Sequence, residues 1–291
     1  MNEQAKPEEP TIRVLREGDI PFAMEVKNLA GWNQTARDWS GYIEYEPEGC
    51  FLAELAGRKA GTATTIGYGD RFGWIGMVLV HPESRRGGIG TKLLRKSITH
   101  LQARGVRSVK LDATAMGRKV YVPMGFVDEY ELSRYEGTAP AAVEATSAAV
   151  QFMTERDLPE LVAFDAPIFG AERPLVLRSM SQRNPEFCFV RREAGKITGY
   201  LIARHGQSAV QVGPWLARDA AGADELWRAF LRRVPGQRVF VDVPHPNGAA
   251  LALVQGSGFT VQRGFSRMYL GENRWPGEPG CVFGTSSAEK G

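Results

Sequence analysis

The 291-residue sequence has few cysteines, few histidines and no long hydrophobic run. Its three cysteines, Cys50, Cys188 and Cys281, are far apart and odd in number, which predicts neither a disulfide framework nor a zinc site. No apolar segment approaches the roughly 20 residues that a membrane-spanning helix needs. We therefore expect a cytoplasmic protein in a reducing compartment, with no bound metal and no membrane contact.

Charge of one sign is not in excess either. The sequence has 36 Lys and Arg against 33 Asp and Glu, a net charge of +3 that is too small and too dispersed to predict nucleic-acid binding. The length favours about two domains. The first ten residues are polar and acidic, so they predict a disordered tail and not a signal peptide.

The most informative stretch, residues 74–101, passes from an apolar run through three glycines into a helical pattern. Residues 74–80 are apolar and rich in β-branched side chains, as in a strand that is buried on both faces. After Gly90, apolar residues recur at helical spacing. A helix start offers unpaired N–H groups and partial positive charge, and Arg85 and Arg86 add full charges. The predicted ligand is therefore a phosphate.

Two common phosphate-binding motifs do not match this loop. The Walker pattern requires Gly-Lys-Ser/Thr, whereas the sequence has Gly90-Thr91-Lys92. The dinucleotide fingerprint requires a third glycine where Leu93 stands. A glycine-rich turn without a ligand is the remaining alternative, but a turn needs one glycine and here three follow two arginines.

The loop instead resembles a known family. Residues 85–90, RRGGIG, match the Arg/Gln-x-x-Gly-x-Gly/Ala signature of the GNAT acetyltransferases, and residues 121–126, YVPMGF, resemble the Tyr-x-x-x-Gly-Phe element of that family. In the family, the loop amides hold the coenzyme A pyrophosphate, and the preceding strand diverges from its neighbour so that its backbone binds pantetheine. The residues that the resemblance implies in coenzyme A binding are Val78, Leu79, Val80, Arg85, Arg86, Gly87, Gly88, Ile89, Gly90 and Thr91.

The resemblance implies an acetyl-CoA-dependent N-acetyltransferase that transfers the acetyl group directly to a primary amine. Such a reaction needs an oxyanion donor, an acid and a base. A backbone N–H near Leu79 or Val80 would polarise the thioester carbonyl. Tyr121 stands at the position of the family's usual acid, which protonates the departing sulfur, although a packed aromatic would explain it too.

The base and the acceptor site are less sharply defined. Asp112, near the end of a strand, is the candidate base, with Asp38 and Glu44 as others, although Asp112 could simply cap the following turn. Trp32 and Asn33 lie in a segment of aromatic and short polar residues that suits a pocket wall or a packed helix. In the family this region borders the acceptor site, so both are candidate substrate-binding residues.

The second half of the chain repeats the first. Residues 155–159, ERDLP, echo residues 17–21, EGDIP, and Cys188 echoes Cys50, at one offset of 138 residues (157 − 19 and 188 − 50). We expect an α+β (mixed α/β) fold of two tandem GNAT-like domains, each a mostly antiparallel central sheet flanked by helices. The predicted divisions are a disordered tail (1–10), a catalytic domain (11–136), a linker (137–149), a degenerate GNAT-like domain (150–271) and a surface or disordered tail (272–291).

The second copy is predicted not to bind coenzyme A. An ungapped alignment of residues 76–94 on residues 213–231 replaces the arginines and glycines of the loop with Asp224, Glu225, Trp227 and small residues. Carboxylates would repel a pyrophosphate. The expected acceptor is a small-molecule or peptide amine, and a homodimer is left open. The alternatives are a non-catalytic acyl-CoA-binding regulator and an acyltransferase for a longer acyl-CoA.

Overall fold

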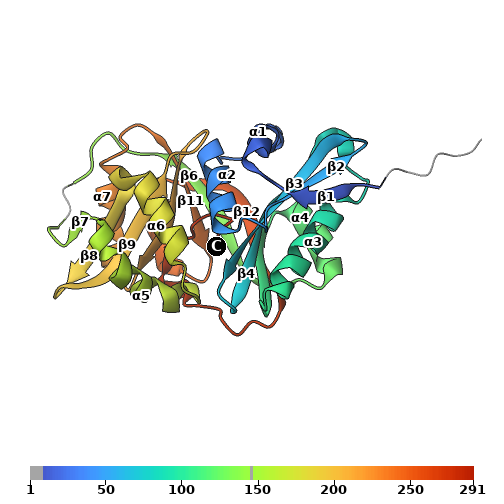
Figure 1. Ribbon diagram of the computed structural model, residues 1–291. Helices are drawn as coiled ribbons and strands as arrows, with labels where there is room; N and C mark the ends of the chain where they lie inside the picture. The colour runs from blue at the N-terminus through green and yellow to red at the C-terminus, as the bar shows by residue number, and fades with distance from the viewer. Residues whose placement is uncertain (1–8, 145–146) are drawn as a thin grey trace, which may run out of the picture.

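The computed structural model describes residues 9–144 and 147–291, which form one continuous sheet with helices on both faces (Figure 1). Residues 1–8 of the predicted tail and residues 145–146 of the predicted linker lie outside the described part. The mixed α/β class is confirmed. Within the described residues, no helix combines the length and apolar character needed to cross a membrane.

The first half contains six strands and four helices. Its strands are β1 Thr11–Val14, β2 Phe51–Leu55, β3 Arg58–Tyr68, β4 Phe72–Val80, β5 Ser108–Ala113 and β6 Val127–Thr138. Its helices are α1 Ile20–Leu29, α2 Ala36–Tyr45, α3 Ile89–Ala103 and α4 Ala115–Tyr121. Side chains alternate across β2, so that Cys50 and Leu52 pack with α1 and α2, while Phe51 and Ala53 pack with α3 on the opposite face.

The second half repeats this order and adds one short strand. Its strands are β7 Val150–Phe152, β8 Cys188–Glu193, β9 Lys196–Arg204, β10 Val210–Ala217, β11 Arg238–Pro244, β12 Thr260–Gly271 and β13 Val282–Gly284. Its helices are α5 Leu158–Phe169, α6 Pro174–Arg183, α7 Ala220–Leu231 and α8 Gly248–Gly256.

The two halves share one sheet because their final strands are exchanged. The strand order is β1-β2-β3-β4-β5-β12-β6-β11-β10-β9-β8-β7, with β13 paired to β10. Strand β12 of the second half pairs with β5 of the first, and β6 of the first half pairs with β11 of the second. Each half-sheet is therefore completed by a strand from the other half.

Reciprocal ion pairs mark the exchange. Arg267 on β12 donates to both oxygens of Asp112 on β5, at 2.8 and 2.9 Å. Arg134 on β6 donates to both oxygens of Asp242 on β11, at 2.7 and 2.8 Å. All four side chains are buried. Each repeat thus supplies an arginine to the aspartate of the other repeat.

Strand β4 diverges from β5, as the resemblance implies. The two strands pair in parallel only from Phe72 to Trp74, opposite Ser108 to Lys110. Beyond Trp74, Met77 has a φ of 49° and the β3–β4 register shifts, which is the signature of a bulge that bends the strand. The divergence opens a gap between two neighbouring strands of the sheet.

The expectation that residues 272–291 lie on the surface or are disordered is wrong for their last ten residues. Strand β13 pairs with β10 where β10 diverges from β11, and residues 285–291 continue between the two halves (Figure 1). Ser286, Ser287, Glu289 and Lys290 are all buried. The helical and strand periodicities cannot reveal this segment, because it is held by contacts with distant strands.

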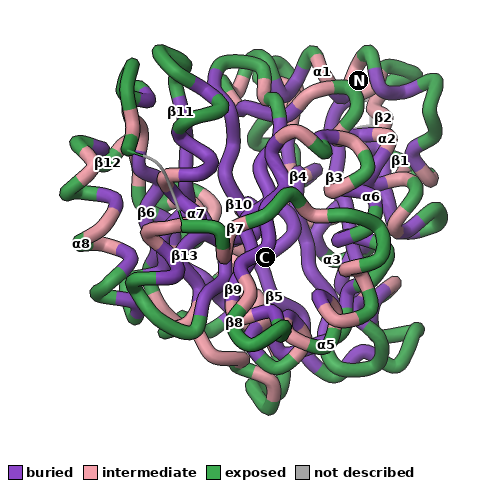
Figure 2. Tube along the Cα trace, turned by 90° about the vertical axis from the view of Figure 1, so that its left-hand side faces the viewer, coloured by how far each residue is buried: buried purple, intermediate pink, exposed green. Residues whose placement is uncertain are grey.

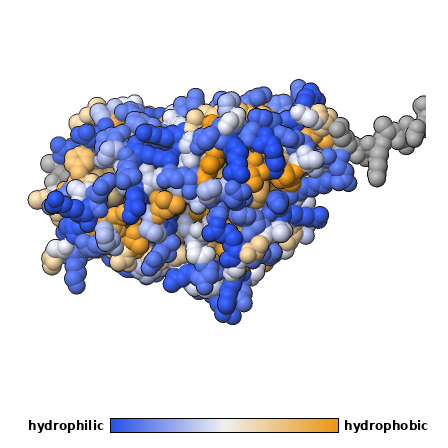
Figure 3. Space-filling model, in the orientation of Figure 1, coloured by the Kyte–Doolittle hydropathy of each residue, from blue (hydrophilic) through white to orange (hydrophobic). Residues whose placement is uncertain are grey.

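The centre of the molecule is the most buried region (Figure 2). One hydrophobic cluster joins Phe72 and Trp74 of β4 to Leu161, Leu177 and other residues of the second half. The face of the molecule in Figure 3 is mostly hydrophilic, with only small hydrophobic patches. The cluster around Phe72 and Trp74 therefore links the two halves through buried side chains.

Candidate active site

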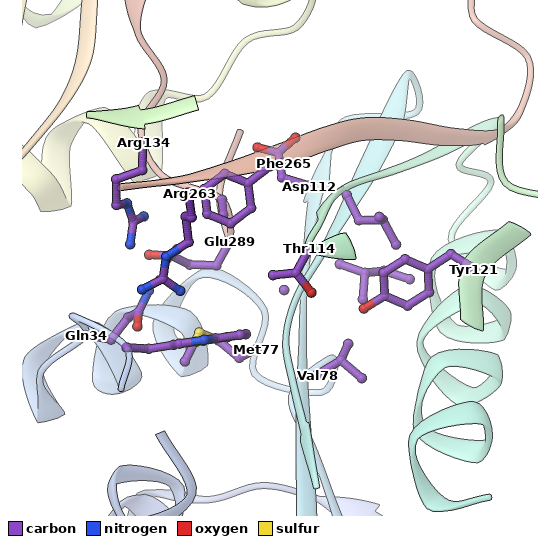
Figure 4. A pocket seen from close by; sticks show the side chains of 15 residues that line it. Gln34, Met77, Val78, Asp112, Thr114, Tyr121, Arg134, Arg263, Phe265 and Glu289 are labelled. Carbon is purple, nitrogen blue, oxygen red and sulfur yellow. The ribbon is translucent and has the colours of Figure 1, made fainter. Parts of the chain in front are cut away.

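A cavity lies where β4 diverges from β5 (Figure 4). Its empty volume is about 520 Å³, which includes space that is open to solvent. Strands β4, β5, β6 and β12, helix α4, the segment before α2 and the C-terminal residues all contribute to its wall. The lining residues are Trp32, Gln34, Ile75, Gly76, Met77, Val78, Leu111, Asp112, Thr114, Tyr121, Arg134, Arg263, Phe265, Ala288 and Glu289.

The loop after β4 can receive an anion. Helix α3 begins at Ile89 behind Gly88, which has a φ of 73° and supplies no side-chain cap. The first N–H groups of the helix are therefore available to a ligand. Arg85 and Arg86 are exposed, and among the described residues neither is paired with a carboxylate. Open space surrounds Gly88, so the loop has room for a pyrophosphate.

The corresponding helix of the second half is already capped by its own chain. The carboxylate of Asp219 accepts a hydrogen bond from the Gly222 N–H at 2.7 Å. Only Arg218 and Asp219 separate β10 from α7, whereas residues 81–88 separate β4 from α3. Strand β13 also fills the gap beside β10. The second half therefore offers neither a free helix start nor an open gap.

The ungapped alignment of the two loops is wrong, because most of the loop is missing from the second half. Trp227 does not stand near a phosphate site but is buried against Trp215, with ring centroids 5.0 Å apart. Glu225 accepts a hydrogen bond from Arg191 at 2.7 Å, and Asp224 pairs with Arg228. The carboxylate at the helix start is Asp219, which the alignment did not identify.

Tyr121 extends from the end of α4 toward the cavity (Figure 4). Burial raises the pKa of Tyr121 to about 12. The phenol is therefore neutral near neutral pH and has a proton to donate. Its ring also packs near Phe126, with centroids 5.9 Å apart, so the aromatic is both packed and open to the cavity.

Asp112 lines the cavity, but both of its carboxylate oxygens accept hydrogen bonds from Arg267. Burial raises the pKa of Asp112 against the opposing effect of Arg267. Asp242, the counterpart of Asp112 in the second half, makes the same pair with Arg134. The pair is therefore present also in the half whose helix start is capped by Asp219. The cap of the following turn is Thr114, which accepts from the Gly117 N–H. The geometry favours a structural role for Asp112, and its role as base stays a prediction.

The two candidate substrate-binding residues lie in different places. Trp32 lines the cavity. Asn33 does not: its side chain donates to the Ala209 carbonyl at 3.0 Å and accepts from the N–H groups of Ser208 and Ala209. These hydrogen bonds hold the Asn33 side chain against a loop of the second half. Asn33 was predicted to bind substrate, but its side chain lies outside the cavity wall that Trp32 lines. The two side chains diverge because adjacent residues in an extended segment point to opposite sides.

The other candidate bases also lie outside the cavity wall. The carboxylate of Asp38 accepts a hydrogen bond from the N–H of Thr35, the N-cap of α2, and pairs with Arg204 at 2.9 Å. Glu44 accepts from Arg183 at 2.6 Å. Neither carboxylate is free to approach an amine in the cavity between β4 and β5.

Sequence reasoning missed the residues that the second half and the tail supply. Arg263 and Phe265 come from β12, and Glu289 comes from the C-terminal segment. Burial opposes ionisation of Glu289, but Lys290 and Arg204 outweigh it and hold the pKa of this carboxyl well below its usual range. Strand β12 takes the place in the second half that β6 takes in the first, and the sequence repeat gave no sign that it crosses into the first half.

Comparison with protein-family models finds a match in each half of the chain. The model of the Acetyltransferase (GNAT) family matches residues 21–126, and that of the Acetyltransferase (GNAT) domain matches residues 161–284. The chain is a tandem GNAT protein. The two matches fall on the two repeats, so the predicted duplication and family are confirmed.

Relatives of this tandem GNAT protein include proteins named as acyltransferases. The holothin acyltransferase of Pseudoalteromonas sp. (strain SANK 73390) is 26% identical over 261 residues, 89% of this chain and 87% of that protein. The mycothiol acetyltransferase of Streptomyces bingchenggensis (strain BCW-1) is 32% identical over 120 residues, 38% of this chain and 39% of that protein.

Solved structures share the architecture. A proposed acetyltransferase from Pyrococcus horikoshii has a TM-score of 0.82 at 22% sequence identity. The match covers 100% of this chain and 99% of the chain of that structure. A tandem GNAT protein from the clavulanic acid biosynthesis pathway has a TM-score of 0.64 at 14% identity, covering 90% of this chain and 98% of its own. These similarities establish the fold.

Proposed function

We propose that this tandem GNAT protein is an acetyl-CoA-dependent N-acetyltransferase with one active site, in the first half. One observation carries the proposal. The uncapped start of α3, the gap between β4 and β5 and the phenol of Tyr121 occur together in the first half. In the second half, Asp219 caps the helix and β13 fills the gap.

The residues around the cavity suit direct transfer to an amine. The loop at Arg85, Arg86 and Gly88 would bind the pyrophosphate, and the backbone of Val78, Leu79 and Val80 would bind the pantetheine arm. A backbone N–H of this strand would stabilise the negative charge that develops on the thioester oxygen. The neutral amine nitrogen attacks the acyl carbon, the carbon–sulfur bond breaks, and Tyr121 donates its proton to the leaving sulfur. The nitrogen loses one proton as it becomes an amide, and this proton passes to a base or to water, from which the Tyr121 phenolate regains its own.

The proposal extends to the setting of the enzyme. We place it in the reducing cytoplasm, with a small amine as acceptor and without metal or nucleic acid as partner. In the described part of the chain, no group of three His, Cys, Asp or Glu side chains could hold a metal ion, and no cysteine is in a disulfide.

The double substitution Gly88→Asp with Arg86→Glu tests the donor site. It places two carboxylates at the start of α3, where like charge opposes a pyrophosphate, so we expect at least ~100-fold weaker binding of acetyl-CoA, since the loss of charge-assisted hydrogen bonds costs about 1.5–3 kcal/mol each. Isothermal titration calorimetry with the full chain measures the affinity.

Gly57→Asp with Arg58→Glu is the matched control. Gly57 has a φ of 70°, close to the 73° of Gly88, and has open space around it in the turn between β2 and β3. The control carries the same charge change and the same backbone strain, and we expect it to bind acetyl-CoA as the wild type does. Equal affinity of the loop variant and the control would overturn the assigned donor site.

Turnover separates the enzyme from its alternatives. Release of free thiol from acetyl-CoA with a broad amine panel would support the transferase. Tight binding without thiol release would instead identify an acyl-CoA-binding regulator. A panel of propionyl-, butyryl- and hexanoyl-CoA completes the test, because a higher kcat/KM with a longer acyl group would overturn the acetyl assignment.

A further inference from the structure

Arg263 on β12 is a cation without a counterion in the cavity wall. It lines the cavity and is half-buried, and among the described residues no carboxylate forms an ion pair with it. Its Nε donates to the side-chain oxygen of the neighbouring Gln262 at 3.0 Å. A partly buried charge that lacks a partner is costly, so an anion in the cavity would stabilise it.

The neighbouring arginines cannot accept such an anion as readily. Arg134 is held by both oxygens of Asp242, and Arg267 by both oxygens of Asp112. Burial, followed by the positive charge of Arg134, lowers the pKa of Arg263 below that of a free arginine. One unpaired guanidinium, with two adjacent donors, suits a single carboxylate.

Gln34 offers a second unpaired group in the same wall. Its side chain is buried, and its Nε2 donates to Glu289 at 3.0 Å. Its Oε1 is buried and has no hydrogen-bond partner in the part of the chain that the structure describes. A ligand N–H or O–H beside the anionic group would satisfy this oxygen.

We propose that the acceptor of this acetyltransferase carries a carboxylate that binds Arg263. In the acceptor, this carboxylate lies at the opposite end from the reacting amine. Arg263 and Tyr121 lie on opposite sides of the cavity (Figure 4), so the carboxylate and the amine are several bonds apart. The inference rests on the function proposed above, because it takes Tyr121 as the acyl-transfer end.

The proposal also explains what the second half contributes. Arg263 and Phe265 reach the active cavity only because β12 is paired with β5 and β6. The second repeat has no open donor site of its own, but its last strand supplies the cation that recognises the acceptor. In this view the second half supplies the side chain that binds the substrate carboxylate, and the first half performs the transfer.

Matched acceptors test the carboxylate. We would compare linear ω-amino carboxylates of increasing length with the corresponding ω-amino amides, using thiol release from acetyl-CoA by the full chain. For the wild type we expect kcat/KM to favour the best carboxylate over its amide by ~10-fold or more, since a hydrogen bond to a charged group is worth about 1.5–3 kcal/mol.

Arg263→Gln should remove this preference. We expect KM for the amino carboxylate to rise by ~10- to 100-fold and the kcat/KM preference for the carboxylate over the amide to disappear, with KM for acetyl-CoA unchanged. Arg232→Gln is the control, because Arg232 is exposed and carries the same charge. Equal rates with amide and carboxylate in the wild type, or a preference that survives Arg263→Gln, would overturn the proposal.

Two further outcomes are distinguishable. A preference for ω-aminoalkyl phosphates over carboxylates would overturn the carboxylate and identify a phosphate instead. If no amine is acetylated, the proposed function fails, and calorimetric binding of the ω-amino carboxylates to the coenzyme A-saturated chain then tests the subsite alone. If the wild type and Arg263→Gln bind these amino carboxylates with identical affinity, the proposed carboxylate subsite is overturned.

Discussion

Tyr121 combines the two properties of a general acid that protonates a leaving thiolate. It faces the cavity, and its phenol stays neutral because burial raises its pKa to about 12. The Tyr-x-x-x-Gly-Phe pattern located it in the sequence. The structure adds that the end of α4 places the ring beside the gap between β4 and β5.

Tyr121→Phe removes the proton but keeps the ring. We expect kcat to fall by ~10²- to 10⁴-fold, the usual contribution of a positioned acid, while the affinity for acetyl-CoA stays the same. Thiol release and calorimetry measure the two quantities. Tyr269→Phe, at a half-buried tyrosine of β12 outside the cavity wall, is the control. Unchanged kcat in Tyr121→Phe would show that the phenol is only a packing group.

Asp112 shows the limit of residue-by-residue reasoning. Its position near the end of a strand made it a candidate base, but that position is also where the exchanged strand places Arg267. Removing one partner of such a buried pair leaves an uncompensated charge and costs about 3–5 kcal/mol. A loss of activity in an Asp112 variant would therefore not by itself identify a base.

The helices α3 and α7 occupy corresponding places in the two halves but differ at their starts. Both follow a strand that diverges from its parallel neighbour. Helix α3 begins behind Gly88 with its first N–H groups uncapped, whereas α7 begins behind Asp219, whose carboxylate occupies that place. A shorter loop and one aspartate thus place a carboxylate of the chain itself at the start of α7, where α3 leaves its N–H groups uncapped.

Asp219→Ala tests this difference between the helices. We expect the free energy of unfolding to fall by about 1 kcal/mol, because a side-chain cap is lost. The stoichiometry of acetyl-CoA should remain one per chain, since β13 still fills the gap beside β10. Urea denaturation and calorimetry provide the measurements, with Asp219→Asn as the variant that keeps a capping oxygen. Binding of a second acetyl-CoA would contradict the assignment of a single site.

At the scale of the whole molecule, the halves are not independent domains. Their final strands are exchanged, and residues 285–291 lie between them. Gly76 of β4 approaches the C-terminal segment so closely that an added Cβ would lie 2.6 Å from the Cβ of Glu289. Unfolding of one half would therefore leave strands of the other without partners.

We expect a single cooperative unfolding transition. Cys50 in the first half and Cys188 in the second are both buried, so each thiol reports on the opening of its own half. Labelling of the two thiols across a urea series, read by mass spectrometry, should give one shared midpoint, with the half-buried Cys281 as an internal reference. Two separate midpoints would show that the halves unfold independently despite the exchange.

The sequence alone determined the family and the duplication, and it located the glycine-rich loop before α3 and Tyr121, because each depends on local patterns or on a constant offset between repeats. The path of β6 and β12, the burial of residues 282–291 and the cavity positions of Arg263 and Glu289 depended on the tertiary structure. The two exchanged strands have similar burial patterns, so the local pattern does not distinguish their partners. Which partner each strand takes is decided by long-range packing, and that choice places Arg263 and Phe265 in the cavity wall.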